Sequence, residues 1–173
     1  IKFVKFREPG GSKNSELIRT LLMKKETKFH KITDLFLYMA ARNENFINII
    51  SKNINKKVIL IDRFVDSTIA YQHYGMGIDL KMVNYLNVKI LKKIQPNFTF
   101  LHTVSIKNLK KRLKKRSVLN RYDKFNDNFY SKAQKGFIKL SKKNKSKYMI
   151  IDSNKKIEIN KSIIIKKISE LTL

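Results

Sequence analysis

Apolar residues gather in four short runs along the chain. They lie at residues 1–6, 57–61, 97–102 and 147–152, and β-branched and aromatic types are frequent among them. Runs of this length and composition predict strands. The run at 57–61 is apolar from Val58 onward, as expected of a buried strand in a parallel sheet.

The segments between these runs carry apolar residues at spacings near 3.6, which predicts helices. We expect Ser15 to cap the first helix and Thr33 or Asp34 to cap the second. Ser105 is the expected cap of a basic helix over 106–116. Strands that alternate with helices predict an α/β fold in which parallel strands are flanked by helices.

Length and composition favour one domain over residues 1–173. A chain of 173 residues that is 42% hydrophobic can enclose one core and is short for two. It contains no cysteine, which favours a reduced, cytoplasmic setting over a secreted disulfide framework. No apolar run approaches the roughly 20 residues of a membrane span.

Residues with chemical potential follow the predicted strand at 57–61. An acid and a guanidinium, Asp62 and Arg63, come directly after it, at the carboxyl end where open α/β sheets bind ligands. Ser67, Thr68 and Tyr71 then lie within about one helical turn, so their side chains can face one crevice. The alternative is a charged loop that opens a helix.

The first predicted strand ends in a similar way, at Arg7-Glu8-Pro9-Gly10-Gly11-Ser12. Pro9 disfavours helix at the preceding residue, and glycines allow the backbone to approach a ligand closely. We therefore expect Arg7 to point into the same crevice as Arg63. An ordinary turn with a solvated charge pair is the other interpretation.

Tyr38 and Arg42 are separated by four residues on the second predicted helix and so lie about one turn apart. An aromatic face beside a guanidinium can stack on a base and hydrogen-bond to its edge. A core tyrosine beside a surface arginine gives the same spacing.

The charge of the chain is strongly positive. It has 39 Lys and Arg against 13 Asp and Glu, a formal net charge of +26, which by itself suggests a polyanionic partner. Lysine is scattered almost everywhere, as codon bias would produce, and the one dense cluster lies at 107–115. That cluster is compatible with a nucleic-acid patch, a solvated helix face or a phosphate-binding segment.

A charged segment and a single histidine are also candidates for functional features. Residues 116–128 are charged and poor in apolar side chains, which is typical of a mobile lid. His102 has no second His or Cys nearby in the sequence, so we interpret it as a histidine at a strand end rather than as a metal ligand.

Taken together, these motifs closely resemble bacterial thymidylate kinase over essentially the whole chain. The R-E-P-G-G string at 7–11 and the D-R-F-V-D-S-T-I-A-Y-Q string at 62–72 are specific to that family in combination. The Leu35–Arg42 segment, Gln95-Pro96-Asn97 before a strand and a lid with two arginines follow in the same order.

The resemblance implies transfer of the γ-phosphoryl group of ATP to dTMP, giving dTDP, with Mg²⁺, in a P-loop-kinase-like domain. By position, Tyr38 would stack on thymine and Arg42 would address the base edge. The phosphate of dTMP would be bound by Arg7, Arg63 and Arg19, with Glu8 beside them. The base and sugar would be faced by Ser67, Thr68, Tyr71 and Gln72. Arg116 and Arg121 would be lid arginines over ATP, and Asp62 would lie near Mg²⁺. The resemblance also suggests a cytoplasmic homodimer without a specific nucleic-acid or membrane partner.

The use of arginine agrees with these roles, because guanidinium groups bind phosphate oxygens in a bidentate way that lysine cannot. A bias toward lysine would have removed arginines that served only as charge. The arginines at 7, 42, 63, 116 and 121 are therefore informative.

One departure from the family is large. No G-x-x-x-x-G-K-[ST] loop occurs in the chain, which also starts without Met. We expect an N-terminally truncated chain that lacks the central strand and the Walker A loop, with little or no kinase activity. The neighbouring strands at 57–61 and 97–102 would then leave their edges unpaired or close on each other.

Two alternative functions stay open at this point. A basic protein that binds single-stranded nucleic acid would use lysine patches with aromatic stacking, and its binding would depend steeply on salt. A related nucleoside or nucleotide kinase would differ in base preference at Tyr38, Arg42, Thr68 and Gln72.

Overall fold

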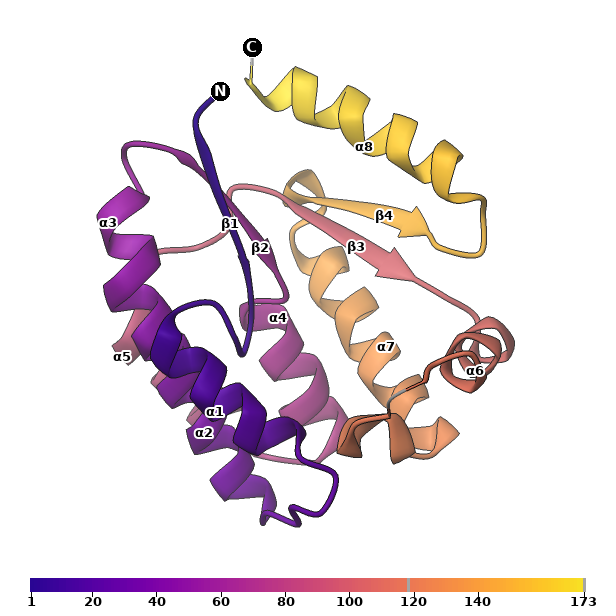
Figure 1. The fold of residues 1–173 in the computed structure, drawn as a ribbon. Coiled ribbons are helices and arrows are strands. Elements are labelled where there is room, and N and C mark those ends of the chain that lie inside the picture. The colour runs from indigo at the N-terminus through magenta and orange to yellow at the C-terminus, as the bar shows by residue number, and fades with distance from the viewer. Residues whose placement is uncertain (118, 173) are drawn as a thin grey trace.

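The computed structural model describes residues 1–117 and 119–172 and contains the four predicted strands (Figure 1). They are β1 (Phe3–Arg7), β2 (Val58–Asp62), β3 (Thr99–Thr103) and β4 (Tyr148–Asp152). The helical elements are α1 (Lys13–Met23), α2 (Lys31–Asn45), η1 (Phe46–Ile50), α3 (Ser51–Asn53), α4 (Val65–Thr68), η2 (Ile69–Gly75), α5 (Leu80–Leu91), α6 (Ile106–Lys114), η3 (Arg121–Lys124), α7 (Asp127–Lys143), η4 (Lys145–Lys147) and α8 (Ile157–Thr172). The α/β prediction is confirmed.

The strands form two parallel pairs rather than one ladder. β1 pairs with β2 from Phe3 opposite Val58 to Arg7 opposite Asp62, and β3 pairs with β4 in the same manner. Within the described residues β2 and β3 do not pair with each other. Figure 1 shows the two pairs diverging, with α7 beside β3 and α8 along β4. We expected the strands at 57–61 and 97–102 either to leave their facing edges unpaired or to pair with each other. Within the described residues the structure shows the first arrangement.

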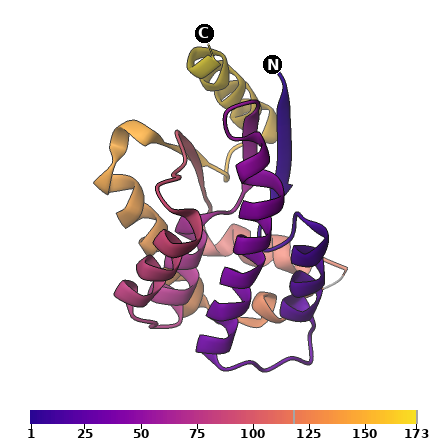
Figure 2. The same cartoon turned by 90° about the vertical axis from the view of Figure 1, so that its left-hand side faces the viewer.

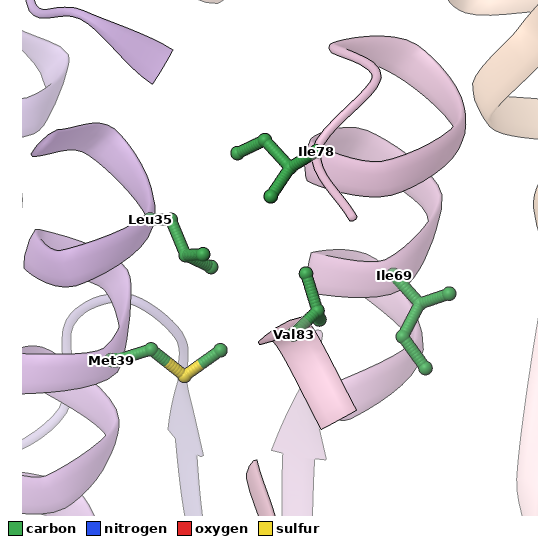
Figure 3. Packing of buried hydrophobic residues seen from close by; sticks show 5 residues of the cluster. All are labelled: Leu35, Met39, Ile69, Ile78 and Val83. Atoms are coloured by element: carbon green, nitrogen blue, oxygen red, sulfur yellow. The ribbon is translucent and has the colours of Figure 1, made fainter. Parts of the chain in front are cut away.

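A buried cluster joins α2 to the elements that follow β2. Leu35 and Met39 of α2 face Ile69, Ile78 and Val83 across the interface (Figure 3). The spacing of four residues puts Leu35 and Met39 on one side of the helix, and each fully buried side chain of this size contributes about 1.5–3 kcal/mol. This packing fixes α2 relative to η2 and α5.

The helix starts correct two of the predicted caps. Ser12, not Ser15, caps α1, and its side chain accepts from the Ser15 amide. The cap of α2 is His30, whose ring accepts from the Ile32 amide, rather than Thr33 or Asp34. Asp34 instead lies inside the helix and is buried. Its carboxylate makes a long-range contact that is described below. Ser105 caps α6 as predicted.

α2, η1 and α3 follow one another as a single long helical segment, and the two termini lie at one end of the molecule (Figure 2). In the part of the chain that the structure describes, no helix combines the length and the apolar character needed to cross a membrane.

Candidate active site

One cavity of about 510 Å³ lies at the carboxyl ends of β1 and β2, between α1, α2, α4 and α6. Every site residue predicted from the sequence lines it except Arg121. The predicted convergence of Arg7 and Arg63 on one crevice is therefore confirmed. Parallel pairing explains it, because it brings the residues that follow both strands to the same edge.

Among the described residues, the cavity wall contains arginines and no lysine. The chain has seven arginines, which leaves 32 lysines among its 39 basic residues. Six of the arginines line the cavity, and none of its lining residues is a lysine. A wall of guanidinium groups in a lysine-rich chain indicates selection for planar, multidentate binding of an anion.

The end of β2 holds Arg63 in an uncommon backbone conformation. Its φ is +65°, in the left-handed region that residues with a side chain seldom adopt. The guanidinium carbon lies 5.2 Å from the centroid of the Tyr71 ring, and Asp62 beside it accepts the Glu8 amide through its carbonyl at 2.9 Å. Such strain persists only where the surrounding structure enforces it, and it is frequent at ligand sites.

Glu8 and Arg42 form a buried ion pair at the back of the cavity. Arg42 Nε and Nη2 donate to Glu8 Oε2 at 2.9 and 2.5 Å, and Arg42 Nη1 donates to Asn87 Oδ1 at 2.6 Å. The guanidinium carbon also lies 5.3 Å from the Phe64 ring centroid. Arg42 is thus a buried residue rather than the surface arginine of the alternative interpretation. Its role toward a base stays a prediction.

Two buried polar atoms of residues that line the cavity have no partner within the described residues. They are Glu8 Oε1 and Gln72 Nε2, and both residues line the cavity. A buried donor or acceptor without a partner costs about 1–3 kcal/mol. An acceptor and a donor left free in a cavity wall are suited to hydrogen-bond a ligand.

Arg7 and Arg19 reach the cavity from opposite ends of the turn that joins β1 to α1. The exposed Arg7 lies 3.6 Å from Glu16. Burial and the nearby charge of Arg7 lower the pKa of Arg19. Two guanidiniums that repel each other in this way favour an anion between them.

Tyr38 meets a second aromatic residue of the cavity lining, Tyr122. The ring centroids are 6.1 Å apart and the rings meet edge to face. Burial raises the pKa of Tyr38 to about 12, so its hydroxyl stays protonated at neutral pH. Tyr122 is 8% exposed and lines the same cavity. Its only signal in the sequence was its place in the charged segment.

The two predicted lid arginines differ in their contacts. Arg116 lines the cavity and donates to the Asp123 carboxylate at 2.7 and 2.9 Å. Arg121 lies outside the lining and donates to Asp34, whose other oxygen accepts from Tyr122 Oη at 2.7 Å. The predicted lid segment 116–128, of which residue 118 lies outside the described part, is thus tied to α2.

The structure adds residues that sequence reasoning missed. Asn87 holds Arg42, Asp34 holds the lid, and Arg112 lines the cavity from α6. The only sequence signal for Arg112 was its being an arginine in a run of lysines. Asn87 carried none, because single polar residues on helices are ordinary, and Asp34 was expected only as a helix cap.

An acidic residue of the cavity lining is suited to contact a hard cation such as Mg²⁺. The described residues contain no group of three or more His, Cys, Asp or Glu side chains that could hold a metal. Mg²⁺ is commonly held by one or two carboxylates together with substrate phosphates. The exposed Asp62 at the end of β2 fits that role, since it faces the arginine-lined cavity.

Parallel strands with helices, and a guanidinium-lined cavity at their carboxyl ends with aromatic side chains beside it, define the chain as an α/β protein with a site for a phosphate-bearing nucleotide. Comparison with known proteins specifies this class. The model of the family described as thymidylate kinase matches residues 1–164.

Relatives and solved structures agree with the family match. Thymidylate kinase from Sulfurihydrogenibium sp. (strain YO3AOP1) is 37% identical over 164 residues, which cover 93% of this chain and 79% of that protein. The one from Anaplasma phagocytophilum (strain HZ) is 35% identical over 84% of this chain and 65% of its own length. The crystal structure of thymidylate kinase from Ehrlichia chaffeensis superposes with a TM-score of 0.77 at 31% identity, covering 97% of this chain and 80% of that one.

The chain belongs to the thymidylate kinase family. Its activity class is that of a phosphotransferase, with dTMP and ATP as family substrates and a divalent metal as cofactor.

Proposed function

We propose that the cavity binds dTMP as phosphoryl acceptor, with the phosphate at Arg7, Arg19 and Arg63 and the base at Tyr38. The observation that carries this proposal is the lining itself, which contains six of the seven arginines of the chain and no lysine. Phosphoryl transfer requires positioned cations around the phosphates and little covalent chemistry from the protein. An arginine-lined crevice meets that requirement.

The opposite end of the cavity suits a base and a sugar. Tyr38 provides a ring for stacking, Arg42 is fixed by Glu8 at the back wall, and Gln72 Nε2 is a free buried donor. Thr68 is buried beside it, and Ser67 and Tyr71 line the side that a deoxyribose would face. This arrangement favours thymine over a larger base.

The donor side of the reaction is proposed to use Arg116 and Arg121 for the ATP phosphates and Asp62 for Mg²⁺. Mg²⁺ bound there would neutralise charge on the transferring phosphoryl group. The sequence contains no G-x-x-x-x-G-K-[ST] loop. We therefore expect this chain to bind dTMP and to transfer phosphate slowly or not at all.

Calorimetry of dTMP binding to wild type and Arg63→Lys tests the acceptor site. A lysine keeps the charge but loses bidentate geometry, so dTMP affinity should fall about tenfold. The control is Lys5→Arg on the exposed side of β1, which should leave the affinity unchanged. Equal affinity of wild type and Arg63→Lys for dTMP would refute the phosphate role.

A coupled assay of ADP release with dTMP and ATP tests the donor side. Little or no turnover is expected, and turnover at ordinary kinase rates, about 1–100 s⁻¹, would contradict that expectation. Competition with dUMP, dCMP and dGMP in the calorimeter separates dTMP from other acceptor bases.

We further propose a cytoplasmic homodimer without a specific nucleic-acid partner. Large apolar side chains are exposed on neighbouring helices, among them Leu17 on α1, Phe36 on α2 and Val88 on α5. Light scattering after gel filtration should give twice the chain mass. Anisotropy with labelled oligo-dT should show weak, non-specific retention, whereas tight and steeply salt-dependent binding would favour the single-strand binder.

A further inference from the structure

Asn45, the last residue of α2, is fully buried and uses both ends of its side-chain amide. Its Oδ1 accepts from the Ser12 amide at 2.9 Å and from Ser15 Oγ at 2.8 Å, and its Nδ2 donates to the Gly10 carbonyl at 2.7 Å. A buried amide with three partners is a rigid connector, because breaking any bond strands a polar group.

These bonds hold the turn that links the two arginines of the predicted phosphate site. β1 ends at Arg7, the turn follows, and α1 carries Arg19 on its second turn. Ser12 and Ser15, the two serines that Asn45 contacts, are the cap and the first turn of α1. The position of α1 relative to β1 therefore depends on this turn.

The backbone of the turn packs closely against the Asn45 side chain. Gly11 has φ of +127°, and a Cβ built on it would lie 2.7 Å from Asn45 Oδ1. The amide thus packs directly against the backbone. Glu16 also contacts the turn: its carboxylate accepts from the Gly11 amide at 3.0 Å and lies 3.6 Å from the exposed Arg7. Exposed ion pairs of this kind are weak.

Arg7 and Arg19 carry like charges and face one cavity, so their mutual repulsion tends to separate them. The buried amide opposes this separation when no ligand is bound. We propose that Asn45 is a positioning residue for the nucleotide phosphate: it fixes the Gly10–Ser15 turn against α2 so that Arg7 and Arg19 converge on one anion. This inference rests on the proposed dTMP site.

The role predicts an effect confined to the phosphate. The proposed base site is formed by Tyr38 and by Arg42, whose guanidinium bonds to Glu8 and Asn87 and not to Asn45. Loss of the amide should therefore weaken dTMP binding without weakening thymidine binding. A purely structural role would weaken both ligands equally.

The experiment measures the affinities of dTMP and thymidine for wild type and Asn45→Ala by calorimetry, with thermal melts to verify folding. We expect dTMP affinity to fall about tenfold and thymidine affinity to change less than twofold. Gly11→Ala, which pushes a methyl group toward Oδ1, should reproduce the selective loss with Asn45 intact. Asn48→Ala, an exposed asparagine one turn further whose amide bonds to Glu44, is the matched control and should change neither affinity.

The outcomes separate the two levels of the argument. If wild type does not bind dTMP more tightly than thymidine, the proposed phosphate site is wrong, and the role of Asn45 is lost with it. If wild type prefers dTMP and both turn variants keep that preference, or lose both ligands equally, the site stands and the inference about Asn45 is overturned.

Discussion

Two arginine–carboxylate pairs in this cavity have almost the same shortest nitrogen–oxygen distance and very different surroundings. Arg42 and Glu8 approach to 2.5 Å with side chains 2% and 5% exposed. Arg116 and Asp123 approach to 2.7 Å, but the arginine side chain is 55% exposed. Short distance is thus no measure of what a pair contributes. Burial decides how much is lost when one partner is removed, since an uncompensated charge in the interior cannot be solvated.

The difference follows from the elements that carry the pairs. Arg42 projects from the side of α2 that also carries Leu35 and Met39, and Asn87 of α5 accepts a hydrogen bond from it. Arg116 lies after the end of α6 in the predicted lid, where water reaches the guanidinium. The first pair is part of the core, whereas the guanidinium of the second pair is exposed to solvent.

The largest effect is expected from Glu8→Ala. It leaves the buried Arg42 guanidinium without its counter-charge, so the free energy of unfolding should fall by about 3–5 kcal/mol. Urea denaturation measures this loss. Glu26→Ala, at an exposed position, is the control and should stay within about 0.5 kcal/mol of wild type. A loss for Glu8→Ala as small as that of the control would mean that the pair is not buried in solution.

An intermediate effect is expected from Asp34→Asn, because the Asp34–Arg121 pair is largely buried, with side chains 4% and 12% exposed. The asparagine keeps an acceptor for Tyr122 but removes the charge that holds Arg121. The free energy of unfolding should fall by about 1–3 kcal/mol. Denaturant titration gives the loss. Tyr122→Phe, which removes only the hydroxyl, should cost about 1 kcal/mol, and the order of the two variants is the check.

A small effect is expected from Asp123→Asn. The side chain still accepts from the Asn120 amide, a bond of 3.0 Å in wild type, and only the exposed charge pair with Arg116 is lost. Exposed pairs contribute about 0.2–1 kcal/mol, and 0.5 M salt should remove the difference from wild type. A loss above about 2 kcal/mol would place this pair with the buried one and remove the contrast.

The comparison also shows what the sequence could predict. The four strands, the α/β class and the convergence of Arg7 and Arg63 followed from local patterns, because apolar runs and residues at strand ends are local features. Helical spacing also indicated that Thr68 faces the crevice and that Tyr38 lies one turn from Arg42. The predicted role of Tyr38 toward thymine and the choice of Gln72 came from resemblance to a family.

The remaining contacts could not be predicted because they join distant segments. Asp34 was expected to cap α2, yet its carboxylate binds Arg121, 87 residues away. The division of the strands into two pairs depends on neighbours that local sequence does not specify. Asn45 and Asn87 each look like ordinary helical asparagines until folding brings Gly10 and Arg42 to them.

The smallest effect at neutral pH, and the most sensitive to conditions, is expected from Asp66→Asn. Asp66 is a partly buried carboxylate without an arginine hydrogen bond, and it accepts from Tyr148 Oη at 2.8 Å. Burial raises its pKa, against the lowering effects of Tyr148 and Arg42. A carboxyl group whose pKa is raised by folding binds its proton more tightly in the folded state, so it destabilises the fold as pH rises through the unfolded value of about 3.9 and beyond. Removing the charge should therefore stabilise the protein slightly at pH 7 and change nothing below about pH 3.5. Thermal melts of both proteins from pH 3 to pH 7 measure the difference, and a variant that is less stable only at neutral pH would show that ionised Asp66, like Glu8, is stabilised by its surroundings.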